Sequence, residues 1–346
     1  MMKRCVFSIA LLAAFCVIHA GHADETPSGF KEIFLAHTQK QDPASEPAAV
    51  QAAEFKRQVE ALTGGTVKVG IFPDGQLGGN RDMAGLVSRG VIQSAFVTAG
   101  GLASLYPPIA VLEMPFVLSS RAAAYAVYDG AFGRGLAADI EKKTGLTVLG
   151  YGDGGGFFAI SKSRRSLHSP SDMRGLRIRT VSGFAVLDVM IRSLGATPVN
   201  VSPNEQYAAL ATGLIDGEIS PPMLMLSSHF DEVQKYVTLT EHLYVPTVWI
   251  FNRDAFARLT PSEQSAVRQA ADAAVAAGRA TARKIEAADG GIPALRRRMS
   301  VSSLSEAEHD AFKAVTQPAV AAEIVKTQGP DGARLLDAFL KAAEGR

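Results

Sequence analysis

Predicted strands and helices alternate along most of this sequence, and their order constrains the fold more than any other feature. The first unit is a strand at 32–36, a helix at 48–62 with its apolar residues on one face, and a strand at 66–72 with alternating apolar residues. The same order continues to residue 150. Because strands joined through helices run parallel, the sequence predicts an α/β fold with mixed, mainly parallel sheets and helices on their faces.

The chain is long enough to require two compact units. Without a leader it has about 320 residues, more than one hydrophobic core comfortably fills. A glycine run at 152–156 precedes a second series of strands and helices, and we predict a flexible crossing there. The expected division is lobe I at 24–151 and 243–280, and lobe II at 152–242 and 281–346, with hinges near 151–156 and 242–248.

One helix is predicted to be unusually long. Thr260, Pro261 and Glu263 supply a capping hydroxyl, a proline in the first turn and a capping-box acid, which together begin a helix. The alanine-rich sequence that follows extends it to about 30 residues, or about 45 Å. Such a helix is predicted to bridge both lobes. The final segment, 305–341, is predicted to be helical and to cover lobe II.

The N-terminus has the pattern of a cleaved export signal. Lys3 and Arg4 precede an apolar run at 5–18, and small residues follow at 21–23. The apolar run is shorter than the roughly 20 residues of a membrane-spanning helix. We therefore predict a signal peptide at 1–23, cleaved after Ala23, and a soluble periplasmic protein.

Both cysteines, Cys5 and Cys16, lie within the predicted signal peptide. The mature chain is therefore expected to contain no disulfide and no catalytic thiol. Lipid attachment at Cys16 is the alternative, but Phe15 is bulky for the position before a lipidated cysteine.

Charge gives no indication of a nucleic-acid partner. Cleavage removes two of the 35 basic side chains and leaves 33 against 34 acidic ones, a formal charge of −1. The predicted helices expose no large apolar face, so we expect a monomer.

Arg179, in the strand pattern Gly175-Leu-Arg-Ile-Arg179, is the main candidate for ligand recognition. A guanidinium group can bind a carboxylate through two parallel hydrogen bonds. With an export signal and no catalytic group nearby, this arginine indicates a protein that binds an organic acid. The alternative is a surface ion pair with an acidic side chain.

Enzymatic chemistry finds little support in the sequence. The five histidines of the predicted mature chain after residue 30 lack the spacing of a helical metal site, and neither a nucleophile elbow nor a phosphate-binding lysine motif is present. We expect no metal, no cofactor and no catalytic residue. A secreted hydrolase is the enzymatic alternative.

Four motifs in order carry a family resemblance. They are Phe72-Pro-Asp-Gly-Gln-Leu-Gly-Gly79, Glu113-Met-Pro-Phe-Val-Leu118, Asp172-Met-Arg-Gly-Leu-Arg-Ile-Arg179, and a pattern from Glu205 to Gly217. The chain resembles the DctP-type solute-binding proteins of tripartite ATP-independent periplasmic (TRAP) transporters over essentially its whole mature length.

This resemblance implies a two-lobed clam-shell that closes on one small organic acid and delivers it to a membrane permease. It implies that Arg179 grips the ligand carboxylate, and Arg177 is expected on the opposite face of the strand. A sensor that presents its closed form to a receptor kinase is an alternative that uses the same two-state closure.

Two departures from the family pattern bear on the ligand. Ile219 and Ser220 stand where relatives carry glutamate and a polar or aromatic residue, and the stretch around Phe158 lacks a second arginine. A hydrogen bond to a charged group contributes about 1.5–3 kcal/mol, so a second carboxylate is bound less well. We predict a monocarboxylate whose apolar or aromatic body contacts Phe158, Phe184 and Trp249.

Three polar residues complete the candidate site. Thr98 and His37 each follow a predicted parallel strand, and ligands of open parallel sheets lie beyond the carboxyl ends of the strands. Ser220 follows the motif that ends at Gly217. We expect all three near the bound acid.

Overall fold

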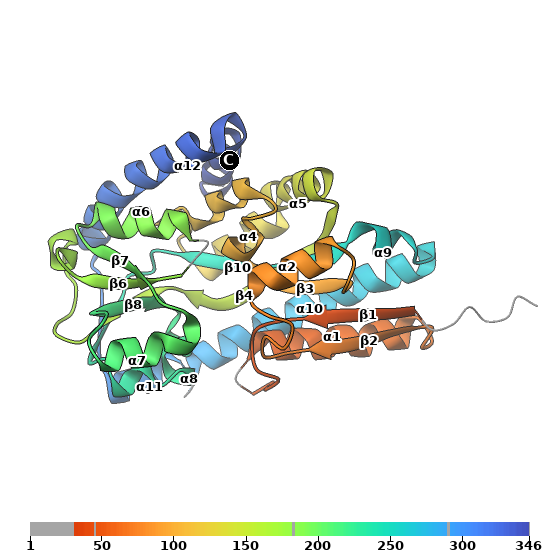
Figure 1. The fold of residues 1–346 in the computed structure, drawn as a ribbon, viewed down its shortest axis with the longest axis horizontal. Helices are drawn as coiled ribbons and strands as arrows, with labels where there is room; N and C mark the ends of the chain where they lie inside the picture. The colour runs from red at the N-terminus through yellow and green to blue at the C-terminus, as the bar shows by residue number, and fades with distance from the viewer. Residues whose placement is uncertain (1–30, 45, 182–183, 289–290, 346) are drawn as a thin grey trace, which may run out of the picture.

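The structure is a computed structural model that describes residues 31–44, 46–181, 184–288 and 291–345. The predicted signal peptide lies outside the described residues. The chain forms two lobes, each built on one mixed sheet with helices packed against it (Figure 1). Within the described part of the chain, no helix is both long and apolar enough to cross a membrane.

The sheet of lobe I has the order β2-β1-β3-β10-β4. Its strands are β1 (Lys31–Ala36), β2 (Val67–Phe72), β3 (Ser94–Thr98), β4 (Leu146–Phe157) and β10 (Tyr244–Asn252). β1 runs parallel to β2 and β3, whereas β10 is antiparallel to β3 and β4. The helices of this lobe are α1 (Pro47–Leu62), α2 (Asn80–Ser88), α3 (Ala99–Leu102), α4 (Arg121–Asp129), α5 (Ala131–Thr144) and α9 (Arg253–Ala257).

The sheet of lobe II has the order β11-β9-β5-β8-β6-β7. Its strands are β5 (Ala159–Lys162), β6 (Arg177–Thr180), β7 (Thr197–Asn200), β8 (Gly217–Ser220), β9 (Tyr236–Leu239) and β11 (Ser300–Ser303). β5 is antiparallel to its neighbours, and the other described pairs are parallel. Its helices are α6 (Ala185–Ser193), α7 (Gln206–Ala211), α8 (Pro222–Ser227) and α11 (Ile292–Arg298).

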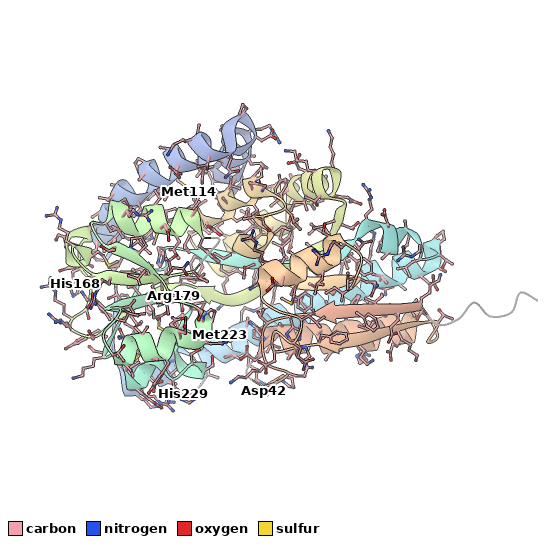
Figure 2. All side chains as sticks on the ribbon, viewed as in Figure 1. Asp42, Met114, His168, Arg179, Met223 and His229 are labelled. Atoms are coloured by element: carbon pink, nitrogen blue, oxygen red, sulfur yellow. The ribbon has the colours of Figure 1, made fainter. Side chains whose placement is uncertain are left out.

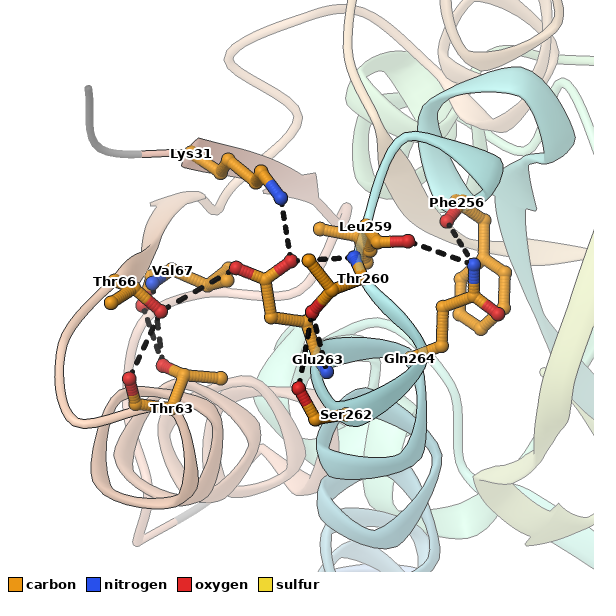
Figure 3. Close-up of polar contacts among 10 residues, drawn as sticks. All are labelled: Lys31, Thr63, Thr66, Val67, Phe256, Leu259, Thr260, Ser262, Glu263 and Gln264. Atoms are coloured by element: carbon orange, nitrogen blue, oxygen red, sulfur yellow. Dashed lines mark hydrogen bonds and ion pairs between the residues drawn. The ribbon is translucent and has the colours of Figure 1, made fainter. Parts of the chain in front are cut away.

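The long helix α10 (Pro261–Ala287) begins as predicted. Thr260 Oγ1 accepts a hydrogen bond from the amide of Glu263, and the Glu263 carboxylate accepts one from the amide of Thr260 at 2.7 Å (Figure 3). The same carboxylate binds Lys31 Nζ at 2.6 Å, which ties the helix start to β1. The 27 residues of α10 contact α1 and β4 in lobe I and α8 and α11 in lobe II, so the helix bridges both lobes.

The glycine run at 152–156 is not the flexible crossing that the sequence predicts. It is the second half of β4 and pairs with β10, with Gly152 opposite Thr247 and Asp153 opposite Pro246. The glycines allow close approach of neighbouring groups: a Cβ on Gly152 would lie 2.4 Å from the Thr247 hydroxyl. Gly156 also has φ +95°, a conformation that glycine adopts most readily.

The two short crossings between the sheets lie next to each other instead, and a third connection, from β10 to β11, runs through α10. Phe158 joins β4 to β5, and residues 240–243 join β9 to β10. The two crossings are hydrogen-bonded to each other, from the amide of Phe158 to the carbonyl of Leu243 at 2.8 Å. The carbonyl of His242 in turn accepts a bond from the amide of Phe116 at 2.7 Å.

The last helix, α12 (Glu306–Ala343), contacts both lobes. It is kinked at Gly329, where φ is 61° and ψ is −149°, and Pro330 follows. The helix packs on α6 and on the 3-10 helix Pro107–Glu113, and before the kink Gln317 Nε2 donates to the carbonyl of Pro115 at 2.8 Å. Beyond the kink Phe339 contacts Tyr128 and Phe132, which lie on or beside α4 and α5, so the C-terminal turns hold lobe I as well.

A buried ion network lies beside the end of β4. Asp153 is completely buried and pairs with Arg121 at the start of α4, while Arg121 also pairs with Glu286 near the end of α10 at 2.9 Å. The amides of Gly155 and Gly156 donate to the second Asp153 oxygen, each at 2.8 Å. One carboxylate therefore holds a helix of lobe I, the bulged strand and, through Arg121, the bridging helix.

We predict that Asp153→Ala lowers the free energy of unfolding by about 3–5 kcal/mol, because it leaves the Arg121 guanidinium without its buried partner. Asp331→Ala is the control. Asp331 is half-exposed and pairs with Lys143 at 2.5 Å, and an exposed pair contributes at most about 1 kcal/mol. Urea unfolding of both variants measures the difference, and equal losses would contradict the assignment.

Glu113 is a buried acid at the end of the 3-10 helix Pro107–Glu113. Glu113 is only 3% exposed, and the 3-10 helix that carries it packs against α12 and α6. Burial raises the pKa of Glu113 to about 8. The native protein therefore retains a proton that the unfolded chain releases near pH 4.5.

We predict that the free energy of unfolding of the wild type falls as pH rises from about 4.5 to about 8 relative to that of Glu113→Gln. The sign follows because the native state binds the proton more tightly throughout this window. Chemical unfolding at several pH values measures the difference, with the exposed Glu306→Gln as control. A pH-independent difference between wild type and Glu113→Gln would rule the prediction out.

Candidate functional site

Arg179 lies near the carboxyl end of β6, in lobe II (Figure 2). The strand alternates, with Ile178 and Thr180 buried and Arg177 and Arg179 more exposed. The expectation that Arg177 points to the opposite face is therefore wrong, since residues two apart on a strand share a face. The two arginines differ in their partners: Arg177 is exposed and forms a two-pronged pair with Asp216, at 3.0 and 2.9 Å.

The Arg179 guanidinium is held from one side only. Its Nε donates to the carbonyl of Val201 at 3.1 Å, and its two terminal nitrogens have no hydrogen-bond partner among the described residues. Burial lowers the pKa of Arg179, and the nearby Glu218 charge opposes that shift. A partly desolvated cation with free donors is suited to a carboxylate.

Glu218 is the polar centre beneath this arginine. It is fully buried in β8 and accepts hydrogen bonds from Ser161 Oγ at 2.8 Å, from Gln206 Nε2 at 3.2 Å and from Ser220 Oγ. Burial raises the pKa of Glu218, and the three donors together with Arg179 lower it. The sequence candidate Ser220 is thus a partner of this acid, with its own side chain buried.

Sequence reasoning did not single out Glu218. The available signal is an acid within the short strand Gly217–Ser220, where every residue is buried. Burial of an acid requires hydrogen-bond donors or a cation nearby. Arg179 and the two serines meet that requirement, but they come from three different strands.

Thr98 and Phe184 both lie close to α3 in the sequence or in space. Thr98 caps this helix, since its Oγ1 accepts from the amide of Gly101 at 3.2 Å, and its own amide donates to Asn80 Oδ1 at 3.2 Å. Phe184 precedes α6 in lobe II and places its ring against Gly100 of α3. The contact between the lobes at Gly100 therefore lies two residues from Thr98.

His37 follows β1 and is 1% exposed. The ring stacks on Phe96 with centroids 6.0 Å apart. Burial lowers the pKa of His37, and the nearby Gln41 side chain and Gln39 backbone oppose that shift. A neutral imidazole can donate one hydrogen bond and accept another.

The remaining two aromatic candidates have different surroundings. Phe158 lies at the strand crossing, partly buried, with its ring edge-on to His242 at 6.5 Å. Trp249 is fully buried in the core of lobe I between Phe55 and Phe96, and its indole N–H donates to Ser94 Oγ at 2.8 Å. We therefore omit Trp249 from the residues proposed to contact the ligand.

A cavity of about 540 Å³ lies between the loop at 43–44 and helices α8, α10 and α11. Figure 2 marks two of its residues, Met223 and His229. None of the seven sequence candidates borders it. Two of its basic side chains are already paired, Arg298 with Asp231 and His229 with Glu232. The Arg179 cluster, which we define as Arg179, Glu218, Ser161, Gln206 and Ser220, has a cation with free donors and is the better candidate for binding an acid.

Comparison with known proteins identifies the family. Residues 38–327 match the DctP family, described as bacterial extracellular solute-binding protein, family 7. The chain belongs to this family.

Two solved structures and one curated relative support the assignment. A TRAP periplasmic solute-binding protein from Ochrobactrum anthropi is 28% identical, with a TM-score of 0.83 over 92% of this chain and 97% of that one. A homologue from Polaromonas sp., bound to D-erythronate, is 28% identical with a TM-score of 0.78 over 90% and 98%. The 2,3-diketo-L-gulonate-binding protein YiaO of Escherichia coli is 32% identical over 65% of this chain and 68% of its own.

The DctP family consists of solute-binding proteins, so this protein is a binding protein and not an enzyme. Across the described residues there is no group of three histidine, cysteine or acidic side chains that could hold a metal ion. In the Arg179 cluster Ser161, Gln206 and Ser220 donate to Glu218, and the terminal nitrogens of Arg179 keep their donors free for a ligand.

We predict that Trp249→Phe in this DctP-family protein lowers the free energy of unfolding by about 1–3 kcal/mol and leaves the choice of ligand unchanged. The substitution removes the hydrogen bond to Ser94 and part of a buried ring. Urea unfolding and a binding screen measure the two effects. A change of ligand preference with unchanged stability would place Trp249 at the site after all.

Proposed function

We propose that this protein captures a small organic acid in the periplasm and delivers it to the membrane subunits of a TRAP transporter. The observation that carries the proposal is the Arg179 guanidinium, which is partly buried and has unpartnered terminal nitrogens in the described structure. The D-erythronate-bound homologue and YiaO support an acidic ligand. Transport also fits the family, whose name is that of extracellular solute-binding proteins.

We infer that the ligand carries one carboxylate. Phe158 lies in the stretch that lacks the second arginine of the family pattern, and Ile219 stands where relatives carry glutamate. Ile219 is buried and pairs across the sheet with Ile160. A second carboxylate at these positions loses its hydration without a charged partner, which opposes binding.

The body of the ligand is proposed to be apolar or aromatic where it meets Phe158 and Phe184. Both rings are partly buried and pack against the main core, which leaves part of each available. A hydroxylated body is the second candidate. It is favoured by the sugar acids that two relatives bind, D-erythronate and 2,3-diketo-L-gulonate.

We predict that Arg179→Ala lowers affinity for the bound acid by about tenfold to a hundredfold, because it removes a charge-assisted hydrogen bond that contributes about 1.5–3 kcal/mol. Arg177→Ala is the matched control. It removes the same side chain two residues earlier on β6, where the partner is Asp216. Its affinity is expected to stay within about twofold of that of the wild type.

The measurement is a thermal-shift and calorimetric screen on protein that has been unfolded and refolded to remove bound solute. The panel contains benzoate, D-erythronate, D-galactonate, succinate and neutral benzamide. Ligand at 100 times its dissociation constant stabilises the native state by about 2.7 kcal/mol. Binding of succinate alone would refute the monocarboxylate assignment, and an equal response of wild type and Arg179→Ala would refute the role of Arg179.

A further inference from the structure

The contact between Phe184 and Gly100 is unusually close for two parts of the protein that belong to different lobes. An ideal Cβ built on Gly100 would lie 2.5, 2.8 and 2.9 Å from Cε2, Cδ2 and Cζ of the Phe184 ring. Ordinary contacts between carbon atoms are about 3.5–4.0 Å. The ring therefore occupies space that any side chain at position 100 would need.

Helix α3 cannot move away from the ring to make room. A Cβ on the neighbouring Gly101 would lie 2.4 Å from Asn80 Cβ and 3.0 Å from the Asn80 carbonyl carbon. Asn80 also accepts a hydrogen bond from the amide of Thr98. The single turn of α3 is thus enclosed by Asn80 of lobe I on one side and by Phe184 of lobe II on the other.

Phe184 is also held in place by its own lobe. Its amide donates to the carbonyl of Val181 at 3.3 Å, and its carbonyl accepts from the amide of Asp188 in the first turn of α6. Helix α6 packs on α12 and, in lobe I, on the 3-10 helix Pro107–Glu113. The backbone that carries the ring is therefore tied to the first turn of α6, and a shift of the ring requires a rotation of its side chain.

We propose that Phe184 and Gly100 form the latch of the closed cleft, with position 100 required to be glycine so that the lobes can approach to this distance. This inference rests on the proposed function, since it concerns closure around the bound acid. The ring of lobe II rests on the bare backbone of α3 beside Thr98. The latch sets how far the lobes close and therefore limits the size of a ligand that can be enclosed.

The requirement for glycine does not come from backbone conformation. Gly100 lies within α3 and is absent from the glycines with positive φ. In a helix alanine is more favourable than glycine. A substitution to alanine therefore suits the helix itself, and the three atoms nearest to its Cβ all belong to the ring of lobe II.

The first test needs no ligand. Gly100→Cys combined with Phe184→Cys places two thiols in a mature chain that has no other cysteine, and bromobimane becomes fluorescent when it bridges two close thiols. We expect bridging at least tenfold faster than in the pair Ala61→Cys and Phe184→Cys, because Ala61 lies near the outer end of α1. Equal rates for the two pairs would overturn the latch.

The second test measures closure through binding of the same panel of acids. Gly100→Ala is expected to lower affinity at least tenfold, whereas the control Gly135→Ala, which has open space around its Cβ on α5, changes it less than twofold. Adding Phe184→Ala to Gly100→Ala should restore the affinity of Phe184→Ala alone. Full affinity of Gly100→Ala would overturn the proposal.

The two experiments separate the latch from the proposed function. If no acid in the panel binds but the thiols at 100 and 184 are bridged rapidly, the latch stands and the organic-acid assignment fails. If an acid binds and bridging is slow, the assignment stands and the latch fails. Unfolding of Gly100→Ala without ligand serves as the folding control and is expected to match that of the wild type or exceed it.

Discussion

The hydrogen-bonded pair of crossings at Phe158 and Leu243 is the constraint on which the two-lobed arrangement depends. Both sheets are continued through this place, β4 into β5 and β9 into β10. Because the crossings are short and bonded to each other, the lobes can change their relative angle there but cannot separate. Helices α10 and α12, which contact both lobes, add two further restraints on that angle.

Two sets of buried polar groups differ in how fully their charges are paired. One set surrounds Asp153 and holds the two-lobed frame, and the other surrounds Arg179 at the proposed ligand site. At the frame, the Asp153 carboxylate is saturated by Arg121, Tyr125 and two backbone amides. At the site, Glu218 is saturated by neutral donors, so Arg179 lies near a buried acid without being paired to it. A cation that is only partly compensated by its own protein retains attraction for an incoming anion. A fully hydrogen-bonded carboxylate at Asp153 thus stabilises the fold, whereas the incompletely paired charge of Arg179 remains able to attract a ligand.

The sequence predicts those features that depend on local pattern. The capped start of α10, the strands β1 and β2 and the placement of Arg179 on a short strand all follow from residues within one element. The glycine run at 152–156 misled prediction, since glycine permits both flexibility and close packing, and only the partner strand decides between them. Features made by distant segments left no local signal. The environment of Glu218 comes from three strands and a helix, and the kinked α12 contacts lobe I both before Gly329, through Gln317, and after it, through Phe339.

The aromatic candidates also show that the sequence alone cannot predict which residues line the cleft. Trp249 and Phe184 are both large and apolar, and the sequence gives equal reason to place each in the cleft. What separates them is the surroundings: Trp249 is enclosed by Phe55, Phe96 and Ser94 of its own lobe, whereas Phe184 contacts the opposite lobe. The same contact has a consequence for binding. A ligand shifts closure only by its difference in affinity for the open and closed states, so contacts that the lobes make directly reduce the difference that the ligand must supply. The contact of the Phe184 ring with Gly100, together with the packing of α6 and α12 on the 3-10 helix Pro107–Glu113, thus lowers the share of closure that the proposed single contact with Arg179 must supply.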